Sequence, residues 1–291
     1  SRLIIPTNQI RVCIGNNMHR RVIVPSRINI IGEHTDYAGG LALPFAIDVK
    51  LELIIKPLET GFSGDEIVIE LWQAAGGYPA ELIVNSEIPI GKGMSSSAAL
   101  CVAVTVGANP NLEQLTICKM AQQLEHQILG TPCGLLDQMA MVFAKENHAT
   151  LINFEDFSID YVVLPKSWKF KLVDSGIHRK LADVDYKSNS EYQQEHVSTE
   201  NDRVLRAINS SAETLGRLLN ESHESLQKLG VSLVEIDSLV KTLQYTEGVL
   251  GARMMGGGYG GMILVSVVND DVLPDATTVS SSSALRFEEF G

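Results

Sequence analysis

Five consecutive residues, EHTDY at positions 33–37, bring together several side chains that can do chemistry. Glu33, His34 and Asp36 each carry or accept protons and form strong hydrogen bonds. The run follows an apolar segment typical of a strand and precedes two glycines, Gly39 and Gly40. His34 alone is more often a structural hydrogen-bonding residue than a catalyst. The EHTDY run alone therefore does not indicate a function, and the other motifs of the chain are needed to interpret it.

A loop with the sequence IPIGKGMSSSAAL, at residues 88–100, predicts an anion-binding site. Gly91 and Gly93 allow unusual backbone dihedrals and close approach to a ligand. The three serines that follow lie where a helix would begin, so they offer hydroxyls and unpaired N–H groups at its positive end. A flexible Gly/Ser linker is the alternative, but this segment runs directly into AALCVAVTV, which has to be buried. The Walker A pattern is not matched.

A second glycine-rich segment, GARMMGGGYGG, places six glycines within residues 251–261. Gly256, Gly258 and Gly261 satisfy GxGxxG literally, but a dinucleotide-binding fingerprint opens a helix, whereas the following GMILVSVV is typical of a strand. We therefore reject the Rossmann interpretation. The glycines predict a close approach of backbone to a ligand or to other backbone, and a tight packing turn between two lobes remains an alternative.

Two carboxylates and one arginine complete the groups with catalytic potential. Asp137 lies in the otherwise apolar stretch CGLLDQM, and Glu125 lies on the helix expected before it. A phosphate cradle requires Mg²⁺, Mg²⁺ requires a carboxylate or a hydroxyl, and an attacking hydroxyl requires a group to orient it or to take its proton. Arg27, directly before the strand-like INIIG, fits equally well a pairing with an acid at the edge of the core or the stabilisation of a transferred phosphate.

The composition limits the partners. The 291 residues carry 23 Lys and Arg against 35 Asp and Glu, and the net charge of −12 disfavours binding to DNA or RNA. No apolar run reaches the roughly 18 to 20 residues of a membrane span, and we find no secretory signal. The cysteines form no CxxC pair and the histidines have no zinc-ligand spacing. We therefore expect a reduced, cytoplasmic protein that contacts neither nucleic acid nor membrane.

Hydrophobic periodicity predicts an α+β fold without a regular βαβ repeat. Strands are expected at residues 20–32, 49–59, 65–72, 148–156, 161–176 and 261–268. Helices are expected from the serines at 95–97 to residue 108, at 112–130, in one or two pieces over 201–230, and at 234–246. The polar tract at 279–287 is expected to be a surface turn without a function. A boundary between the strand-like segments divides the chain into two lobes, residues 1–160 and 161–291.

Taken together, the motifs resemble a known group of enzymes. RINIIGEHTDYAGGLALPFAID, residues 27–48, resembles the signature of the galactokinase family. IPIGKGMSSSAAL resembles the phosphate loop of the GHMP small-molecule kinases, and GARMMGGGYGGMILV resembles their third motif. GTPCGLLDQMA and HESLQKLGVSLVEIDSLV also resemble galactokinase segments, so the similarity extends from Arg21 to Val268. The two glycine motifs specify only the superfamily, whereas EHTDY points to the galactokinase branch.

The resemblance implies a role for each residue that matches a family motif. The implied sugar-binding residues are Glu33, His34, Asp36, Asp137 and Tyr186, the last in the segment HRKLADVDY. Asp137 is also the implied catalytic base for the anomeric hydroxyl, with Arg27 beside it. The implied ATP-binding residues are Gly91, Lys92, Gly93, Met94, Ser95, Ser96 and Ser97, and the implied Mg²⁺ ligands are Ser97 and Glu125.

The implied fold is a two-lobed GHMP kinase, with an N-terminal lobe like ribosomal protein S5 domain 2, a ferredoxin-like C-terminal lobe, and the site between them. The implied reaction is ATP-dependent phosphorylation of the C1 hydroxyl of galactose by a monomer, a reaction that depends mainly on positioning and charge stabilisation. Two alternatives remain. One is a kinase for a related sugar such as N-acetylgalactosamine or arabinose, and the other is a catalytically silent sensor of galactose and ATP. The intact Ser96, Ser97 and Ala98 disfavour the sensor.

Several positions depart from the family pattern. Ser26 stands where the family usually has glycine, Lys92 occupies the variable position of the phosphate loop, and MMGGGYGGM replaces a pattern that more often carries Thr, Phe and Cys. The chain is also shorter than a typical galactokinase. Abrupt joins at 71–84, 105–114 and 186–202 mark places where we expect family segments to be missing, either as deletions or as loops left out of this sequence. Their absence would leave the adenine pocket incomplete.

Overall fold

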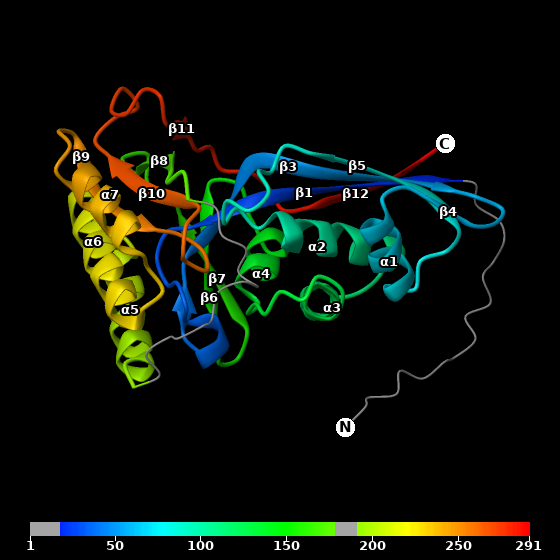
Figure 1. Ribbon diagram of the computed structural model, residues 1–291, viewed down its shortest axis with the longest axis horizontal. Coiled ribbons are helices and arrows are strands. Elements are labelled where there is room, and N and C mark those ends of the chain that lie inside the picture. Colours follow the sequence, from blue (N-terminus) through cyan, green and yellow to red (C-terminus); the bar gives the residue numbers. More distant parts are fainter. Residues whose placement is uncertain (1–17, 178–190) are drawn as a thin grey trace.

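The computed structural model describes residues 18–177 and 191–291, and these residues form an elongated α+β molecule (Figure 1). Three sheets and seven α-helices make up the described part of the chain. None of the described helices is long and apolar enough to cross a membrane. The mixed α+β class expected from the periodicity is confirmed.

The first sheet has five strands in the order β12-β1-β3-β5-β4. Its strands are β1 (His19–Asn29), β3 (Pro44–Pro57), β4 (Phe62–Ser63), β5 (Ala80–Ser86) and β12 (Arg286–Phe290). β1 pairs antiparallel with both β3 and β12. The helices α1 to α4 all lie on one side of this sheet (Figure 1). The long strands expected at the start of the chain are confirmed as β1 and β3.

The strand predicted for the segment DEIVIELW is wrong, because this segment forms helix α1 (Glu66–Ala74). Asp65 caps this helix, because its side chain accepts a hydrogen bond from the N–H of Ile67 at 3.0 Å. Val68, Leu71 and Trp72 are buried and lie on one helical face. The continuous apolar run Ile-Val-Ile does not by itself distinguish a strand from a helix, and the N-cap with the i, i+3, i+4 apolar face favours the helix.

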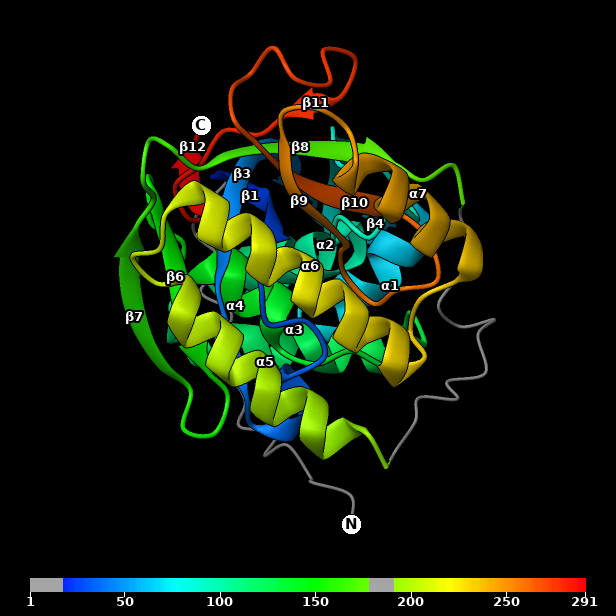
Figure 2. The same ribbon diagram turned by 90° about the vertical axis from the view of Figure 1, so that its left-hand side faces the viewer.

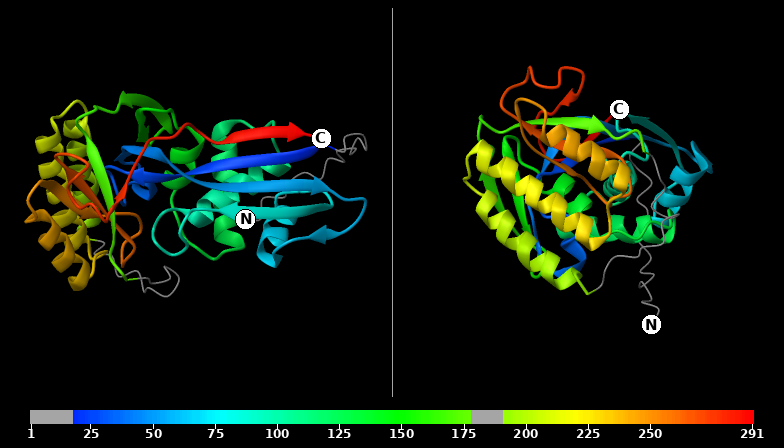
Figure 3. Two further views of the ribbon diagram at one scale, coloured as in Figure 1. Left: turned by 90° about the horizontal axis from the view of Figure 1, so that it is seen from above. Right: turned by 60° about the vertical axis from the view of Figure 1, so that its left-hand side comes forward.

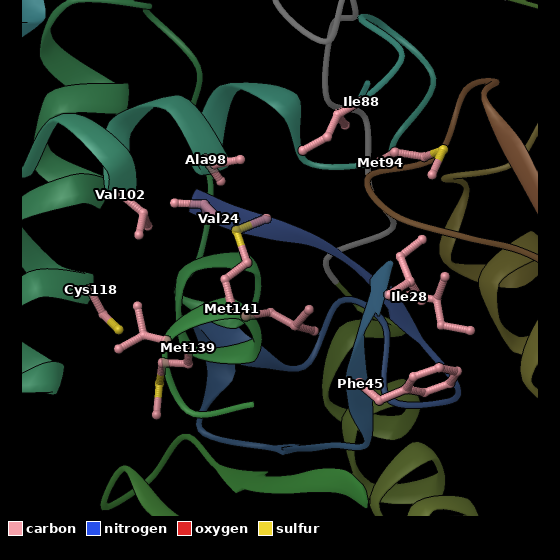
Figure 4. Close-up of a cluster of buried hydrophobic side chains, with 14 of the residues drawn as sticks. Val24, Ile28, Phe45, Ile88, Met94, Ala98, Val102, Cys118, Met139 and Met141 are labelled. Atoms are coloured by element: carbon pink, nitrogen blue, oxygen red, sulfur yellow. The ribbon is translucent and has the colours of Figure 1, made fainter. Parts of the chain in front are cut away.

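The remaining helices of this half are α2 (Ser96–Ala108), α3 (Gln114–Gln127) and α4 (Leu136–Val142). α2 is buried on nearly all sides, as its small, wholly apolar sequence predicts. Figure 4 shows its Ala98 and Val102 among side chains from β1, α3 and α4, including Val24, Cys118 and Met141. The start of α2 and the end of β1 are therefore fixed by one shared core.

The second sheet has the order β11-β8-β10-β9; α6 and α7 pack against it, and α5 lies beside α6 (Figure 2). Its strands are β8 (Lys169–Asp174), β9 (Val249–Met254), β10 (Met262–Val267) and β11 (Thr277–Thr278), and the helices are α5 (Gln193–Ala207), α6 (Ala212–Leu229) and α7 (Val234–Gln244). The helices expected over 201–230 and 234–246 are confirmed, with α5 beginning before the expected start. The glycine-rich loop leads into a strand, as expected, and β9 before it completes an antiparallel pair with β10.

A third sheet, in the order β2-β6-β7, lies between the two halves. Its strands are β2 (Leu41–Ala42), β6 (His148–Asn153) and β7 (Ser158–Val163). The 3-10 turn η1 (Asp36–Ala38) directly precedes β2, so this sheet anchors the far end of the EHTDY segment.

The polar tract 279–287 lies mostly at the surface, as expected, but it is an extended crossing segment and not a turn. Ser282 is only 7% exposed, and its N–H donates to the carbonyl of Ala46 at 2.8 Å. The tract runs from the second sheet to β12, which lies beside β1 at the edge of the first sheet (Figure 3). The backbone of the tract also pairs with β3 at a second point, where the N–H of Asp48 donates to the carbonyl of Ser280 at 3.1 Å.

Candidate active site

The loop at residues 91–97, called here the phosphate loop, winds into the N-terminus of α2 through three left-handed residues. Gly91 has φ +73°, Gly93 has φ +69°, and Ser95, which occupies the N-cap position, has φ +59°. Glycine adopts this conformation freely, whereas Ser95 is strained there. Such a winding directs successive backbone N–H groups towards one point at the positive end of a helix.

Asp137, in the first turn of α4, is held between the end of β1 and the phosphate loop. The Arg27 guanidinium contacts Asp137 Oδ1 through Nε at 2.8 Å and through NH2 at 2.7 Å. The Ser95 hydroxyl donates to Asp137 Oδ2 at 2.5 Å. Arg27 also donates to the carbonyl of Gly93 at 3.0 Å and is 3% exposed. The sequence allowed Arg27 either to pair with an acid at the edge of the core or to stabilise a transferred phosphate. The structure shows the pairing with an acid, Asp137.

Ser97, Glu125 and Gln138 form a second polar cluster beside the first. The Ser97 hydroxyl donates to Glu125 Oε1 at 2.6 Å, and Gln138 Nε2 donates to Glu125 Oε2 at 2.8 Å. Burial raises the pKa of the Glu125 carboxyl, and the hydrogen bond from Ser97 opposes that rise. Gln138 Oε1 is buried without a hydrogen-bond partner. A buried carboxylate, a hydroxyl and an unsatisfied amide oxygen are the hard ligands that suit Mg²⁺.

The described residues contain no group of three or more His, Cys, Asp or Glu side chains that could hold a metal ion. This finding is compatible with Mg²⁺, which usually keeps several waters and takes only one or two protein carboxylates together with phosphate oxygens. The cluster of Ser97 and Glu125 therefore fits that ion, and does not fit a metal that requires a full protein cage.

Glu33 is buried where the two halves of the molecule meet. Its Oε1 accepts from the N–H of Gly256 at 2.7 Å and lies 3.3 Å from NH2 of Arg253 on β9. Arg253 is fully buried and also donates to the backbone carbonyls of Asn29 and Ile30. One guanidinium thus fixes both the end of β1 and the carboxylate that follows it.

The neighbouring His34 and Asp36 have shifted pKa values. Burial lowers the pKa of His34 to about 4, so its imidazole is neutral at pH 7, and its Nδ1 lies 3.1 Å from the Tyr37 hydroxyl. Burial raises the pKa of Asp36 to about 6, and the charges of Asp137 and Glu33 add to the rise. Asp36 Oδ2 accepts from the N–H of Leu136 at 3.2 Å, which ties the EHTDY segment to the helix that carries Asp137.

The predicted site residues that the structure describes therefore lie around one junction, where the EHTDY segment meets the phosphate loop. Two of them, Lys92 and Met94, direct their side chains away from it. Lys92 Nζ pairs with Asp174 of β8 at 2.5 Å. The Met94 side chain is buried in the core, so this residue can offer a ligand only its backbone. Ser26, at the position where the family usually has glycine, donates to the carbonyl of Met94 at 2.9 Å and so supports the loop. Tyr186 lies outside the described residues.

The glycine-rich segment packs its backbone against the phosphate loop, as the glycine density predicts. The N–H of Met262 donates to the carbonyl of Lys92 at 3.1 Å. A Cβ added to Gly261 would lie 2.7 Å from that same oxygen, and one added to Gly258 would lie 2.1 Å from the carbonyl of Val231. Only glycine allows this approach. Since the segment is followed by β10, a dinucleotide-binding turn is excluded.

Sequence reasoning missed Arg253 and the N–H of Gly256 as partners of Glu33. Both belong to GARMMGGG, whose glycines are the only feature that predicts a close backbone approach. An arginine among apolar residues at the end of a strand was the available indication, because a buried guanidinium requires a partner.

Three family models match consecutive parts of the chain. The galactokinase galactose-binding signature matches residues 15–57, the N-terminal domain of GHMP kinases matches residues 65–145, and the C-terminal domain of GHMP kinases matches residues 204–271. These matches, together with the two-part fold, define a small-molecule kinase of the GHMP type and confirm the fold class expected from the motifs.

Curated relatives and solved structures narrow this class. The galactokinase of Thermotoga maritima is 35% identical over 309 residues, which cover 84% of this chain and 88% of the relative. The galactokinase of a Roseiflexus species is 32% identical and covers 88% of this chain and 85% of the relative. The structure of Lactococcus lactis galactokinase complexed with galactose matches with a TM-score of 0.80 at 23% identity, covering 92% of this chain and 95% of that one. The chain belongs to the galactokinase family.

The likeness to more distant structures concerns the fold. The mevalonate kinase of L. major matches with a TM-score of 0.68 at 20% identity, covering 93% of this chain and 97% of that one. The alignment with the Thermotoga maritima relative is longer than this 291-residue chain although it covers only 84% of it. The relative therefore carries segments without a counterpart here, in line with the abrupt joins in the sequence.

Proposed function

We propose that this protein transfers the γ-phosphoryl group of ATP to the C1 hydroxyl of galactose, giving galactose 1-phosphate and ADP. The observation that supports this function best is the position of Asp137, whose two oxygens are held by Arg27 and Ser95 at the junction of the EHTDY segment and the phosphate loop. A carboxylate held in this way can orient a sugar hydroxyl against a phosphate bound at the start of α2.

The sugar would be bound by polar side chains whose geometry is already fixed. Glu33, His34, Asp36 and Asp137 are the proposed contacts to its hydroxyls, together with Tyr186. Glu33 is oriented by Arg253 and Gly256, so its second oxygen remains for a ligand. Neutral His34 can both donate and accept, which suits a hydroxyl.

The catalytic step needs little covalent chemistry from the protein. The C1 oxygen forms a bond to the γ-phosphorus, the bond from that phosphorus to the β-γ bridging oxygen breaks, and the hydroxyl proton passes to Asp137. Arg27 keeps Asp137 oriented and, lying within reach of the Gly93 carbonyl, adds positive charge near the transferred group.

ATP would be bound by the phosphate loop, residues Gly91, Lys92, Gly93, Met94, Ser95, Ser96 and Ser97, mainly through backbone N–H groups. Ser97 and Glu125 would hold Mg²⁺, and this ion would neutralise charge on the β- and γ-phosphates. The contact of Ser95 with Asp137 supports a division of labour in which Ser95 serves the carboxylate and Ser97 serves the metal ion.

We extend the proposal to the organisation of the molecule. Residues 1–160 and 161–291 form the two lobes, with β12 returning to the sheet of the first. The protein acts as a monomer in the cytoplasm on small molecules, without nucleic acid or membrane. The free Cys101, Cys118 and Cys133, two of them buried, support a reducing compartment.

A coupled assay of ADP release, run over galactose, N-acetylgalactosamine, arabinose and glucose, tests the function. We expect turnover with galactose and little with the others. Turnover with N-acetylgalactosamine or arabinose in place of galactose would correct the substrate. Galactose binding without any turnover would overturn the kinase and favour the sensor.

A further inference from the structure

Three side chains on the inner face of α5 hydrogen-bond to the backbone of residues 32–41, called here the sugar loop. His196 Nε2 lies 2.9 Å from the carbonyl oxygen of Glu33, Glu200 Oε1 accepts from the N–H of Gly32 at 2.9 Å, and Asn201 Oδ1 accepts from the N–H of Leu41 at 2.7 Å. These contacts lie at both ends of the sugar loop. In Figure 2, α5 crosses the face of the molecule where that loop lies.

The contact made by His196 has a defined direction. A carbonyl oxygen only accepts, so Nε2 carries the proton and donates to Glu33. Burial lowers the pKa of His196, which keeps the ring neutral and leaves Nδ1 as an acceptor. Nδ1 therefore receives the hydroxyl proton of Ser225 at 2.8 Å, and Tyr192 in turn donates to Ser225 at 3.2 Å. The imidazole is thus locked in one tautomer and one orientation.

Glu200 is equally fixed. Its fully buried carboxylate receives the N–H of Gly32, the Ser222 hydroxyl at 2.7 Å and Arg203 Nε at 2.7 Å. A buried carboxylate with three donors, one of them charged, is satisfied and rigid. It therefore forms a fixed reference point for the start of the sugar loop.

The sugar loop has internal hydrogen bonds that determine its curl and leave its placement open. The N–H groups of Ala38 and Gly40 donate to the carbonyl of Thr35, and the Thr35 hydroxyl contacts the carbonyls of Gly32 and Leu41. Gly40 lies so close to α5 that an added Cβ would be 2.9 Å from Asn201 Oδ1. The external contacts that locate the curled loop thus include the polar face of α5.

We propose that His196, Glu200 and Asn201 are positioning residues of the sugar site, which set the places of Glu33, His34 and Asp36 without touching the sugar themselves. This assignment rests on the proposed function only in the experiment that measures the KM for galactose. Removing a hydrogen bond between α5 and the sugar loop should therefore weaken sugar binding and leave ATP binding at the phosphate loop unchanged.

Asn201→Ala tests this assignment, with Asn109→Ala as the matched control. Asn109 is also part-buried and also makes a side-chain bond to backbone, to the carbonyl of Ala75 at 2.9 Å, but it lies at the end of α2 away from the phosphate loop. For Asn201→Ala we expect the KM for galactose to rise about tenfold, with the KM for ATP unchanged. Asn201→Asp keeps an acceptor for Leu41 and should restore the galactose KM. The control should change neither KM.

Amide hydrogen exchange provides a readout that needs no catalysis. A peptide covering residues 30–42 should exchange about tenfold faster in Asn201→Ala than in wild type, and at the wild-type rate in Asn109→Ala. His196→Leu should have the same effect, and His196→Gln, which keeps a donor for the Glu33 carbonyl, should reduce it.

Unchanged exchange in both Asn201→Ala and His196→Leu would overturn the assignment, as would equal increases in the KM for galactose and ATP. A wild-type protein that turns over no sugar would instead overturn the proposed function. In that case faster exchange at residues 30–42 would still support the positioning role of α5.

Discussion

The phosphate loop and the sugar loop meet at Asp137, but they are held in place in opposite ways. The phosphate loop obtains its shape from its own left-handed residues and the start of α2, and Gly91 at its tip is exposed. The remote contacts from Ser26, Arg27 and Met262 reach only its backbone carbonyls. The sugar loop is half buried and, apart from the contact of Asp36 with Leu136 and the pairing of β2 with β6, it is held by groups more than 150 residues away, on α5, on β9 and at Gly256 after β9. The shape of the phosphate loop is thus specified mainly by its own residues, and the position of the sugar loop mainly by the fold.

This difference has electrostatic consequences. The described ionisable side chain of the phosphate loop, Lys92, lies in a half-exposed ion pair, where water screens its charge. Glu33 and His34 are buried and Asp36 is partly buried, so neighbouring charges are screened less there than at Lys92. A catalyst that binds a neutral, hydroxyl-rich molecule benefits from the second arrangement, because fixed polar groups need no rearrangement when the ligand arrives.

The largest effect is expected at the junction itself. Asp137→Asn retains an oxygen acceptor for Arg27 but removes the charge and the basicity, so kcat should fall by about 10²- to 10⁴-fold. Galactose binding, measured by calorimetry, should change far less, because the sugar loop keeps its external contacts. A kcat within a few-fold of wild type would remove Asp137 from the chemical step and would leave the two loops without a shared catalytic group.

Substituting one cation at each loop, the buried Arg253 or the half-exposed Lys92, compares how much each contributes to the free energy of unfolding. Arg253→Met leaves the Glu33 carboxylate buried without its charged partner, and should lower the free energy of unfolding by about 3–5 kcal/mol. Lys92→Met removes a screened pair with Asp174 and should cost about 0–1 kcal/mol. Urea unfolding of both variants measures the contrast. Equal losses would contradict the division into a locally specified and a fold-specified loop.

Substituting Ser95 and Ser96 in turn distinguishes the roles of their hydroxyls in the phosphate loop. Glycine tolerates the φ of +59° at this position, so Ser95→Gly removes the hydrogen bond to Asp137 without adding strain. We expect kcat to fall about tenfold, as for the loss of a hydrogen bond to a charged group. Ser96→Ala, one residue further on, should act on the KM for ATP instead. The reverse result would assign Ser95 to the nucleotide.

The smallest effect concerns Asp36 and pH. Its folded-state pKa of about 6 lies above the ordinary value of 3.8 because of burial. Between these two values the folded protein retains a proton that the unfolded chain has lost, so this group lowers stability as pH rises from about 4 to about 6. Asp36→Asn lacks this loss and should be more stable than wild type at pH 7.5, on the order of 1 kcal/mol, while binding galactose more weakly.

Urea unfolding at pH 4 and pH 7.5 checks the sign of this effect. The advantage of Asp36→Asn over wild type should be smaller at pH 4, where the wild-type carboxyl is protonated in the folded state and half protonated in the unfolded chain. A constant difference at both pH values would show that Asp36 does not titrate in this window.

The contrast between the loops also explains what the sequence could predict. The glycines and serines at 91–97 predicted unusual backbone dihedrals followed by a helix start, because those residue types act through their own backbone, whereas the left-handed Ser95 was not predicted. The strands β1 and β3 followed from β-branched runs. The segment at 65–72 was predicted wrongly because the continuous run Ile-Val-Ile is compatible with a strand or a helix, and the cap at Asp65 decides between them.

The partners of the sugar loop could not be predicted by the same reasoning. His196 and Glu200 lie in YQQEHVSTEND, a run as polar as any solvated helix face, and only the packing of α5 on α6 and the sugar loop buries them. Roles for Glu33 or Asp137 came from family resemblance, and they remain predictions. Their convergence on one junction depends on contacts between residues about 100 or more apart in sequence.

The pairing of β12 with β1 imposes an order on biosynthesis. β1 can pair with β3 soon after both leave the ribosome, but its other edge has to wait while residues 30–285 are made, about 13 to 50 seconds at about 5–20 residues per second. An open strand edge invites pairing with other nascent chains. Arg20 and Arg21, which contact Glu289 and Glu288 in the finished sheet, place positive charge on that edge and would keep it apart from identical copies until its own partner arrives.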